Sequence, residues 1–95
     1  MNVAWSDRAL RSLAKIHESL ASESLDAANR TVDRILKRGD QLASFPNSGR
    51  VVDRFERPGL RELVEPPYRI VYRVRAHQVQ VIDVFHTSQL PPWER

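Results

Sequence analysis

The segment Tyr68-Arg69-Ile70-Val71-Tyr72-Arg73-Val74 decides the fold of this chain. It is rich in aromatic and β-branched residues, a composition typical of a strand. Successive side chains of a strand point to opposite faces of a sheet, so one face holds both tyrosines with an isoleucine and a valine. The other face carries Arg69 and Arg73 on either side of Val71. The pattern therefore predicts a strand with one apolar face and one basic face.

Turns on both sides of this segment indicate two more strands. Pro66-Pro67 separates it from residues 60–65, and Arg75-Ala76-His77 separates it from residues 78–85. Short turns of this kind join antiparallel strands. Residues 78–85 are apolar on both faces, as expected of a central strand. The C-terminal half is therefore predicted to be a three-stranded antiparallel meander followed by a tail over residues 86–95.

The N-terminal half has helical character after a short strand. Val3-Ala4-Trp5 favours a strand, and Ser6 is suited to cap a helix over residues 7–21. Apolar residues at helical spacing predict a second helix over residues 25–44, with Gly39 as its weak point. The short connection between the two amphipathic helices predicts an antiparallel helical hairpin.

The proline and turn residues of Phe45-Pro46-Asn47-Ser48-Gly49 end the second helix. We interpret residues 50–58 as a loop with a short extended piece at Val51-Val52. The predicted fold is α+β, with a two-helix hairpin packed on a small antiparallel sheet in the order β-α-α-β-β-β. The residues predicted to lie in its core are Leu13, Ile35, Ile70, Tyr72 and Val84.

The composition fits one folded domain over residues 1–95. Hydrophobic residues make up 41% of the chain and charged residues 28%, and a chain of 95 residues has room for one core. There is no cysteine, which excludes disulfides and a cysteine nucleophile. The apolar runs are too short to cross a membrane, and the N-terminus lacks a secretory pattern. We therefore expect a cytoplasmic protein with no membrane partner.

Positive charge gathers in the second half of the chain. The formal net charge is +3, and residues 50–75 contain seven arginines against four acidic residues. Arginine suits bidentate contacts to phosphate or carboxylate. Arg61, Arg69 and His86 fall on three successive strands, so the meander is expected to bring them together as a phosphate-binding and proton-transferring group. The alternative is that the arginines solvate an exposed sheet face and that His86 is a packed histidine.

No metal or cofactor is expected. His17, His77 and His86 are far apart and lack the spacing of metal ligands. The chain also lacks a glycine-rich phosphate loop. Glu62 and Glu65 are interpreted as surface charges.

The chain resembles the RelE/ParE toxins of type II toxin–antitoxin systems along nearly its whole length. The resemblance runs through Trp5-Ser6, Ser48-Gly49-Arg50, residues 60–63 and the segment 68–74, and it continues through Val81-Ile82-Asp83-Val84-Phe85-His86. It implies two helices on a small antiparallel sheet. It also implies a cognate antitoxin as partner, in a toxin–antitoxin hetero-oligomer.

The resemblance implies one of two activities. RelE-like toxins cut mRNA on the ribosome with basic sheet residues, and Arg61, Arg69 and His86 match their catalytic positions. ParE-like toxins inhibit DNA gyrase instead. Gln89 stands where an arginine commonly follows the histidine, and no tyrosine comes after His86. These departures favour a gyrase-directed toxin.

Two alternatives remain open, a ribosome-dependent mRNA endonuclease and a binding module without toxic activity. Arg50 and Arg73 are expected to belong to another functional surface.

Overall fold

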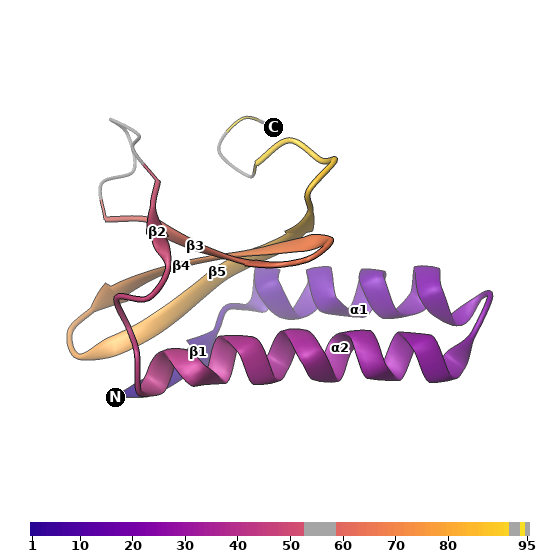
Figure 1. Ribbon diagram of the computed structural model, residues 1–95, viewed down its shortest axis with the longest axis horizontal. Coiled ribbons are helices and arrows are strands. Elements are labelled where there is room, and N and C mark those ends of the chain that lie inside the picture. The colour runs from indigo at the N-terminus through magenta and orange to yellow at the C-terminus, as the bar shows by residue number, and fades with distance from the viewer. Residues whose placement is uncertain (53–58, 92–93, 95) are drawn as a thin grey trace.

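The computed structural model describes residues 1–52, 59–91 and 94, which form two layers (Figure 1). A helical hairpin lies against one face of a sheet that contains five strands within the described residues. The elements are β1 (Asn2–Trp5), α1 (Asp7–Ala21), α2 (Leu25–Asp40), the 3-10 turn η1 (Gln41–Ala43), β2 (Arg50–Val51), β3 (Arg61–Glu65), β4 (Tyr68–Arg75) and β5 (Gln78–His86). The order β-α-α-β-β-β is therefore confirmed, with β2 as an additional two-residue strand.

The sheet has the strand order β1-β5-β4-β3-β2. The meander of β3, β4 and β5 is antiparallel, as the turns predict. β1 differs from the expected antiparallel arrangement because it pairs with β5 in parallel, with Val3 opposite Val79. No hairpin turn joins these two strands, so no local turn imposes an antiparallel direction on them. β2 covers the start of the expected loop, whose residues 53–58 lie outside the described part of the chain.

Serine caps begin both helices. Ser6 Oγ accepts a hydrogen bond from the Ala9 backbone N–H at 3.0 Å, and Ser24 Oγ accepts one from the Ala27 N–H at 3.2 Å. α2 ends at Asp40 rather than at Ser44, because the chain tightens there into η1.

Gly39 has a packing role in α2 and is not merely a weak point of the helix. A Cβ atom built on Gly39 would lie 2.6 Å from Cη2 of the Trp5 indole ring. A glycine at this position therefore lets β1 approach the end of α2 closely.

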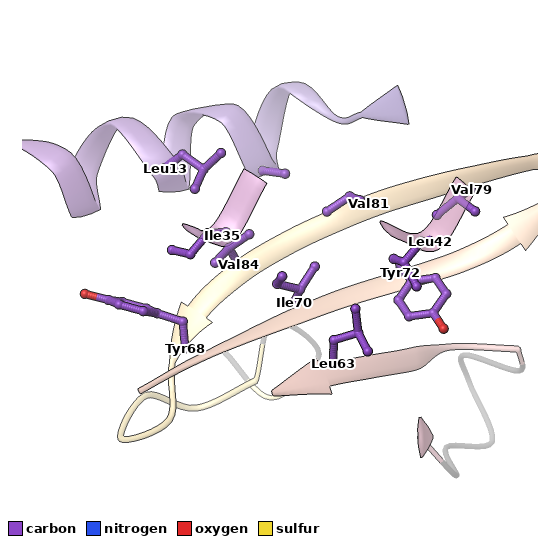
Figure 2. Packing of buried hydrophobic residues seen from close by; sticks show 11 residues of the cluster. Leu13, Ile35, Leu42, Leu63, Tyr68, Ile70, Tyr72, Val79, Val81 and Val84 are labelled. Carbon is purple, nitrogen blue, oxygen red and sulfur yellow. The ribbon is translucent and has the colours of Figure 1, made fainter. Parts of the chain in front are cut away.

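The main core lies between the helices and the face of the sheet that they cover, which we call the inner face (Figure 2). Ile70 and Tyr72 of β4 belong to this core, and Leu13 of α1 and Ile35 of α2 are members of the same cluster. All five predicted core residues, these four and Val84, are at most 5% exposed. The predicted inward face of β4 is thus confirmed.

The opposite side of the sheet, the outer face, carries Arg69, Val71 and Arg73 of β4. Val71 packs there against Leu60 and Phe85, which are 4% and 1% exposed. The outer face therefore has a small apolar centre, with arginines before and after it on β4.

A β-bulge in β5 changes which of its residues point to the inner face of the sheet. Val71 pairs with Asp83 while the next residue, Tyr72, pairs with Val81, so Ile82 is an extra residue in the ladder. Because of this bulge, Val81 and Val84 both join the inner core although they are three positions apart.

Candidate functional site

The outer face presents a pair of arginines that share one carboxylate. Arg50 on β2 lies opposite Glu62 on β3, which lies opposite Val71 of the outer face. Glu62 Oε1 accepts a hydrogen bond from Arg50 Nη2, and Arg69 Nη1 lies 3.8 Å from Glu62 Oε2. The Glu62 side chain is 3% exposed, whereas that of Arg50 is 74% exposed. This trio of residues therefore holds two cations on one buried anion.

Arg73 lies beside an open hollow on the same face. Its Nε donates a 2.9 Å hydrogen bond to Gln80 Oε1 on β5, and Gln80 Nε2 donates in turn to Gln78 Oε1 at 3.3 Å. The hollow has a volume of about 410 Å³ and is lined by Ala4, Trp5, Ser6, Arg73, Gln78, Gln80, Val81 and Ile82. The glutamine pair fixes the orientation of the guanidinium group, which faces a space large enough for a polar group of a ligand.

Arg61 lies on the inner face of β3, because its register partner is the buried Tyr72. Its Nη1 donates hydrogen bonds to the backbone carbonyls of Gly49 at 2.8 Å and Asn47 at 3.2 Å. Tyr72 holds the same loop, since its hydroxyl donates to the Pro46 carbonyl and accepts from the Gly49 N–H, both at 2.8 Å. Arg61 thus holds residues 47–49, which lead into β2, against β3.

His86 ends β5 on the inner face, opposite Tyr68. The two rings meet edge to face, with centroids 5.6 Å apart. His86 Nδ1 accepts a 3.0 Å hydrogen bond from the Ser88 N–H, and the Gln89 side chain accepts one from the His86 backbone N–H at 2.8 Å. Gln89, where the resemblance calls for an arginine, therefore closes the turn after β5.

A second hollow lies where His86 meets α1. It has a volume of about 330 Å³ and is lined by Ser12, Lys15, Ile16, Ser19, Leu20, Tyr68, Val84, His86 and Gln89. Its lining combines apolar residues of α1 and the sheet with the cation of Lys15. It opens on the helix side of the molecule, away from the outer-face arginines.

The structure does not gather the three candidate catalytic residues into one site. Arg69 is on the outer face, while Arg61 and His86 are on the inner face. The register partners of Arg61 and His86, Tyr72 and Tyr68, are four residues apart on β4, which corresponds to roughly 13 Å along the strand. The residues that do come together are Arg50 with Arg69, and Arg73 lies further along the same face.

Sequence reasoning missed two contributors to the outer face. Glu62 is buried and ion-paired, so its interpretation as a surface charge was wrong. The sequence did contain a signal that Glu62 and Arg61 lie on opposite faces of the sheet, because neighbouring residues of a strand such as β3 point to opposite sides. Gln80, the partner of Arg73, became apparent only from the cross-strand register.

The described residues include no group of three or more His, Cys, Asp or Glu side chains placed to hold a metal ion. A membrane span is likewise absent from the helices of this part of the chain, none of which has the length and apolar character required.

Comparison with known proteins assigns the chain to a family. A family model described as the ParE toxin of the type II toxin–antitoxin system parDE matches residues 3–91. The chain therefore belongs to the ParE family of type II toxin–antitoxin toxins, within the RelE/ParE superfamily that its sequence resembles.

Two curated relatives are also named as toxins. "Putative toxin Y4kP" of Sinorhizobium fredii is 38% identical over 96 residues, covering 95% of this chain and 92% of the relative. Toxin RelE2 of Caulobacter vibrioides is 36% identical over 89 residues, covering 93% and 97%.

A solved structure, the chromosomal ParDE TA system from P. aeruginosa, matches with a TM-score of 0.78. The match covers 90% of this chain and 95% of that one at 23% identity, so it supports the fold alone.

Proposed function

We propose that this toxin acts in the cytoplasm by binding DNA gyrase and that a cognate antitoxin neutralises it in a hetero-oligomer. The observation that carries this proposal is the placement of Arg69 and His86 on opposite faces of the sheet. A nuclease needs its phosphate-binding cation and its proton donor at the same reacting group. Inhibition of a protein target by binding needs a surface and no proton transfer by the toxin.

The match to the ParE family model also supports gyrase as the target, because gyrase inhibition is what the ParE resemblance implies. The buried Glu62 and the Arg73–Gln80 hydrogen bond fix the orientation of the outer-face arginines. Prearranged groups of this kind lower the entropic cost of binding a partner.

The hollow beside α1 is the proposed seat of the antitoxin. Ile16 and Leu20 line it with Tyr68, while Lys15 adds a positive charge to its lining. An antitoxin segment with an apolar side chain to insert and an acidic residue to face Lys15 complements this hollow in shape and charge.

One observation favours the second candidate, a ribosome-dependent mRNA endonuclease. His86, Lys15 and Tyr68 line the same hollow, and together they carry an imidazole, an ammonium group and a phenol. These are side chains that transfer protons and bind phosphate in nuclease chemistry. The name of the relative Toxin RelE2 points in the same direction.

Inducible expression in a bacterial host, followed by two assays with the purified toxin, tests these proposals. Gyrase supercoiling should be inhibited, while mRNA on translating ribosomes should stay intact. Cleavage of mRNA without any effect on supercoiling would instead establish the endonuclease.

Charge reversal tests the antitoxin seat separately. Lys15→Glu should weaken capture by the antitoxin encoded beside the toxin, whereas Lys37→Glu makes the same change on α2, outside the hollow. Equal antitoxin affinity of both variants would place the antitoxin elsewhere.

A further inference from the structure

We infer that the outer face binds the phosphate backbone of duplex DNA through Arg73 at one point and through Arg50 with Arg69 at another. This inference rests on the proposed function, since gyrase acts on duplex DNA. It adds a second binding partner to the protein target, on the face of the sheet opposite the proposed antitoxin seat.

Arg73 is arranged as an anion-binding group. The Arg73 Nε donates to Gln80 Oε1. The two terminal nitrogens of Arg73 make no hydrogen bond within the residues that the structure describes. These nitrogens form the paired donors that match two oxygens of a phosphate. The hollow beside Arg73 brings in the side-chain amides of Gln78 and Gln80 as further hydrogen-bonding groups.

Arg50 and Arg69 form the second binding point because one carboxylate serves two guanidinium groups. Glu62 balances only one of the two positive charges. The Arg69 side chain is 34% exposed, so part of it remains accessible to a ligand although its Nε is buried. Glu62 is then a positioning residue that aligns both arginines.

The spacing of these two points favours a polyanion over a single small anion. Arg69 and Arg73 are four residues apart on β4, which corresponds to about 13 Å. One strand of DNA presents a phosphate about every 3.4 Å of helix axis, so two points at this separation contact the same backbone. Arg75 extends the row by alternation along β4.

Fluorescence anisotropy with a short labelled DNA duplex tests this surface. Arg73→Gln and Arg50→Gln should each weaken binding by about tenfold at low salt. Each should also reduce the slope of the salt dependence by about one. Arg30→Gln is the matched control, because it removes the same charge from an exposed residue of α2 that pairs with Asp26. It should change the affinity by less than about twofold.

Three outcomes would overturn the inference: no duplex binding by the wild type, an equal loss in Arg30→Gln, or tighter binding of single-stranded RNA than of duplex DNA. Circular dichroism must show that each variant is folded before its affinity is compared.

Supercoiling inhibition separates this inference from the proposed function. If the wild type inhibits gyrase and Arg73→Gln inhibits it equally well, the role of DNA contact is overturned while gyrase remains the target. If the wild type fails to inhibit gyrase, the proposed function fails whatever the anisotropy shows. Weaker inhibition by Arg73→Gln, together with weaker DNA binding, supports both.

Discussion

Ser12 Oγ on α1 donates a 2.6 Å hydrogen bond to Asp83 Oδ1 on β5, and this bond joins the helix layer to the sheet at the bulge. The Asp83 side chain is completely buried, and it also accepts a 2.8 Å hydrogen bond from the Val84 N–H. Arg8 Nε lies 3.2 Å from Asp83 Oδ2. A buried carboxylate with several partners is costly to remove, because those partners lose their acceptor.

Asp83→Ala should therefore lower the free energy of unfolding by about 3 kcal/mol, as measured by urea denaturation. Arg8→Gln is the comparison, because it removes the ion pair and keeps the hydrogen bonds from Ser12 and the Val84 N–H to Asp83. It should cost less than Asp83→Ala but more than the loss of an exposed ion pair, since the Asp83 carboxylate stays buried. Similar effects of the two substitutions would mean that the ion pair, rather than the buried hydrogen bonds, joins the layers.

Ile70→Ala should destabilise the fold by about 2–5 kcal/mol, because Ile70 is 0% exposed and the change leaves a cavity in the main core. Thermal or urea unfolding measures this loss. Leu25→Ala is the comparison, since Leu25 is 60% exposed at the start of α2 and should change stability by less than about 0.5 kcal/mol. An unchanged melting temperature for Ile70→Ala would contradict the inward orientation of this side chain.

Gly39→Ala should destabilise the protein, although the same change inside an ordinary helix stabilises by about 0.5–1 kcal/mol. The added methyl group would collide with the Trp5 ring. In a Trp5→Ala background the collision is removed, so the sign of the Gly39→Ala effect should reverse. A double-mutant cycle with urea unfolding measures this coupling. Additive effects of the two substitutions would contradict the close packing.

Tyr72→Phe should cost about 1–3 kcal/mol, because the Pro46 carbonyl loses its donor and the Gly49 N–H loses its acceptor. The ring itself stays in the core, so the effect isolates the two hydrogen bonds. We also expect faster hydrogen exchange at Gly49, which precedes β2. Unchanged exchange there would show that Arg61 alone holds this loop.

His86→Gln should leave growth inhibition within about twofold of the wild type if the toxin acts by binding gyrase. Glutamine retains hydrogen bonding but cannot transfer a proton as an imidazole does. Growth curves after induction measure the effect. If growth inhibition disappears while the variant is folded and still bound by antitoxin, proton transfer by His86 is required and the endonuclease is favoured.

The sequence alone determined the local elements of this fold. Ser6 as a cap, the helix over residues 7–21 and the inward face of β4 all follow from spacing within a few residues. These features depend on side-chain period and on local hydrogen bonds, which neighbouring residues specify without help from the rest of the chain.

The tertiary structure decided which candidate site residues meet. Arg61 and Glu62 exchange faces if β3 slips by one position, and only pairing with β4 sets that register. The structure therefore places Glu62, instead of Arg61, beside Arg69. The bulge at Ile82 and the parallel pairing of β1 likewise depend on partners far away in the chain. Strand faces follow from local alternation, whereas register and direction come from long-range hydrogen bonds, so the candidate surface became apparent only with the complete sheet.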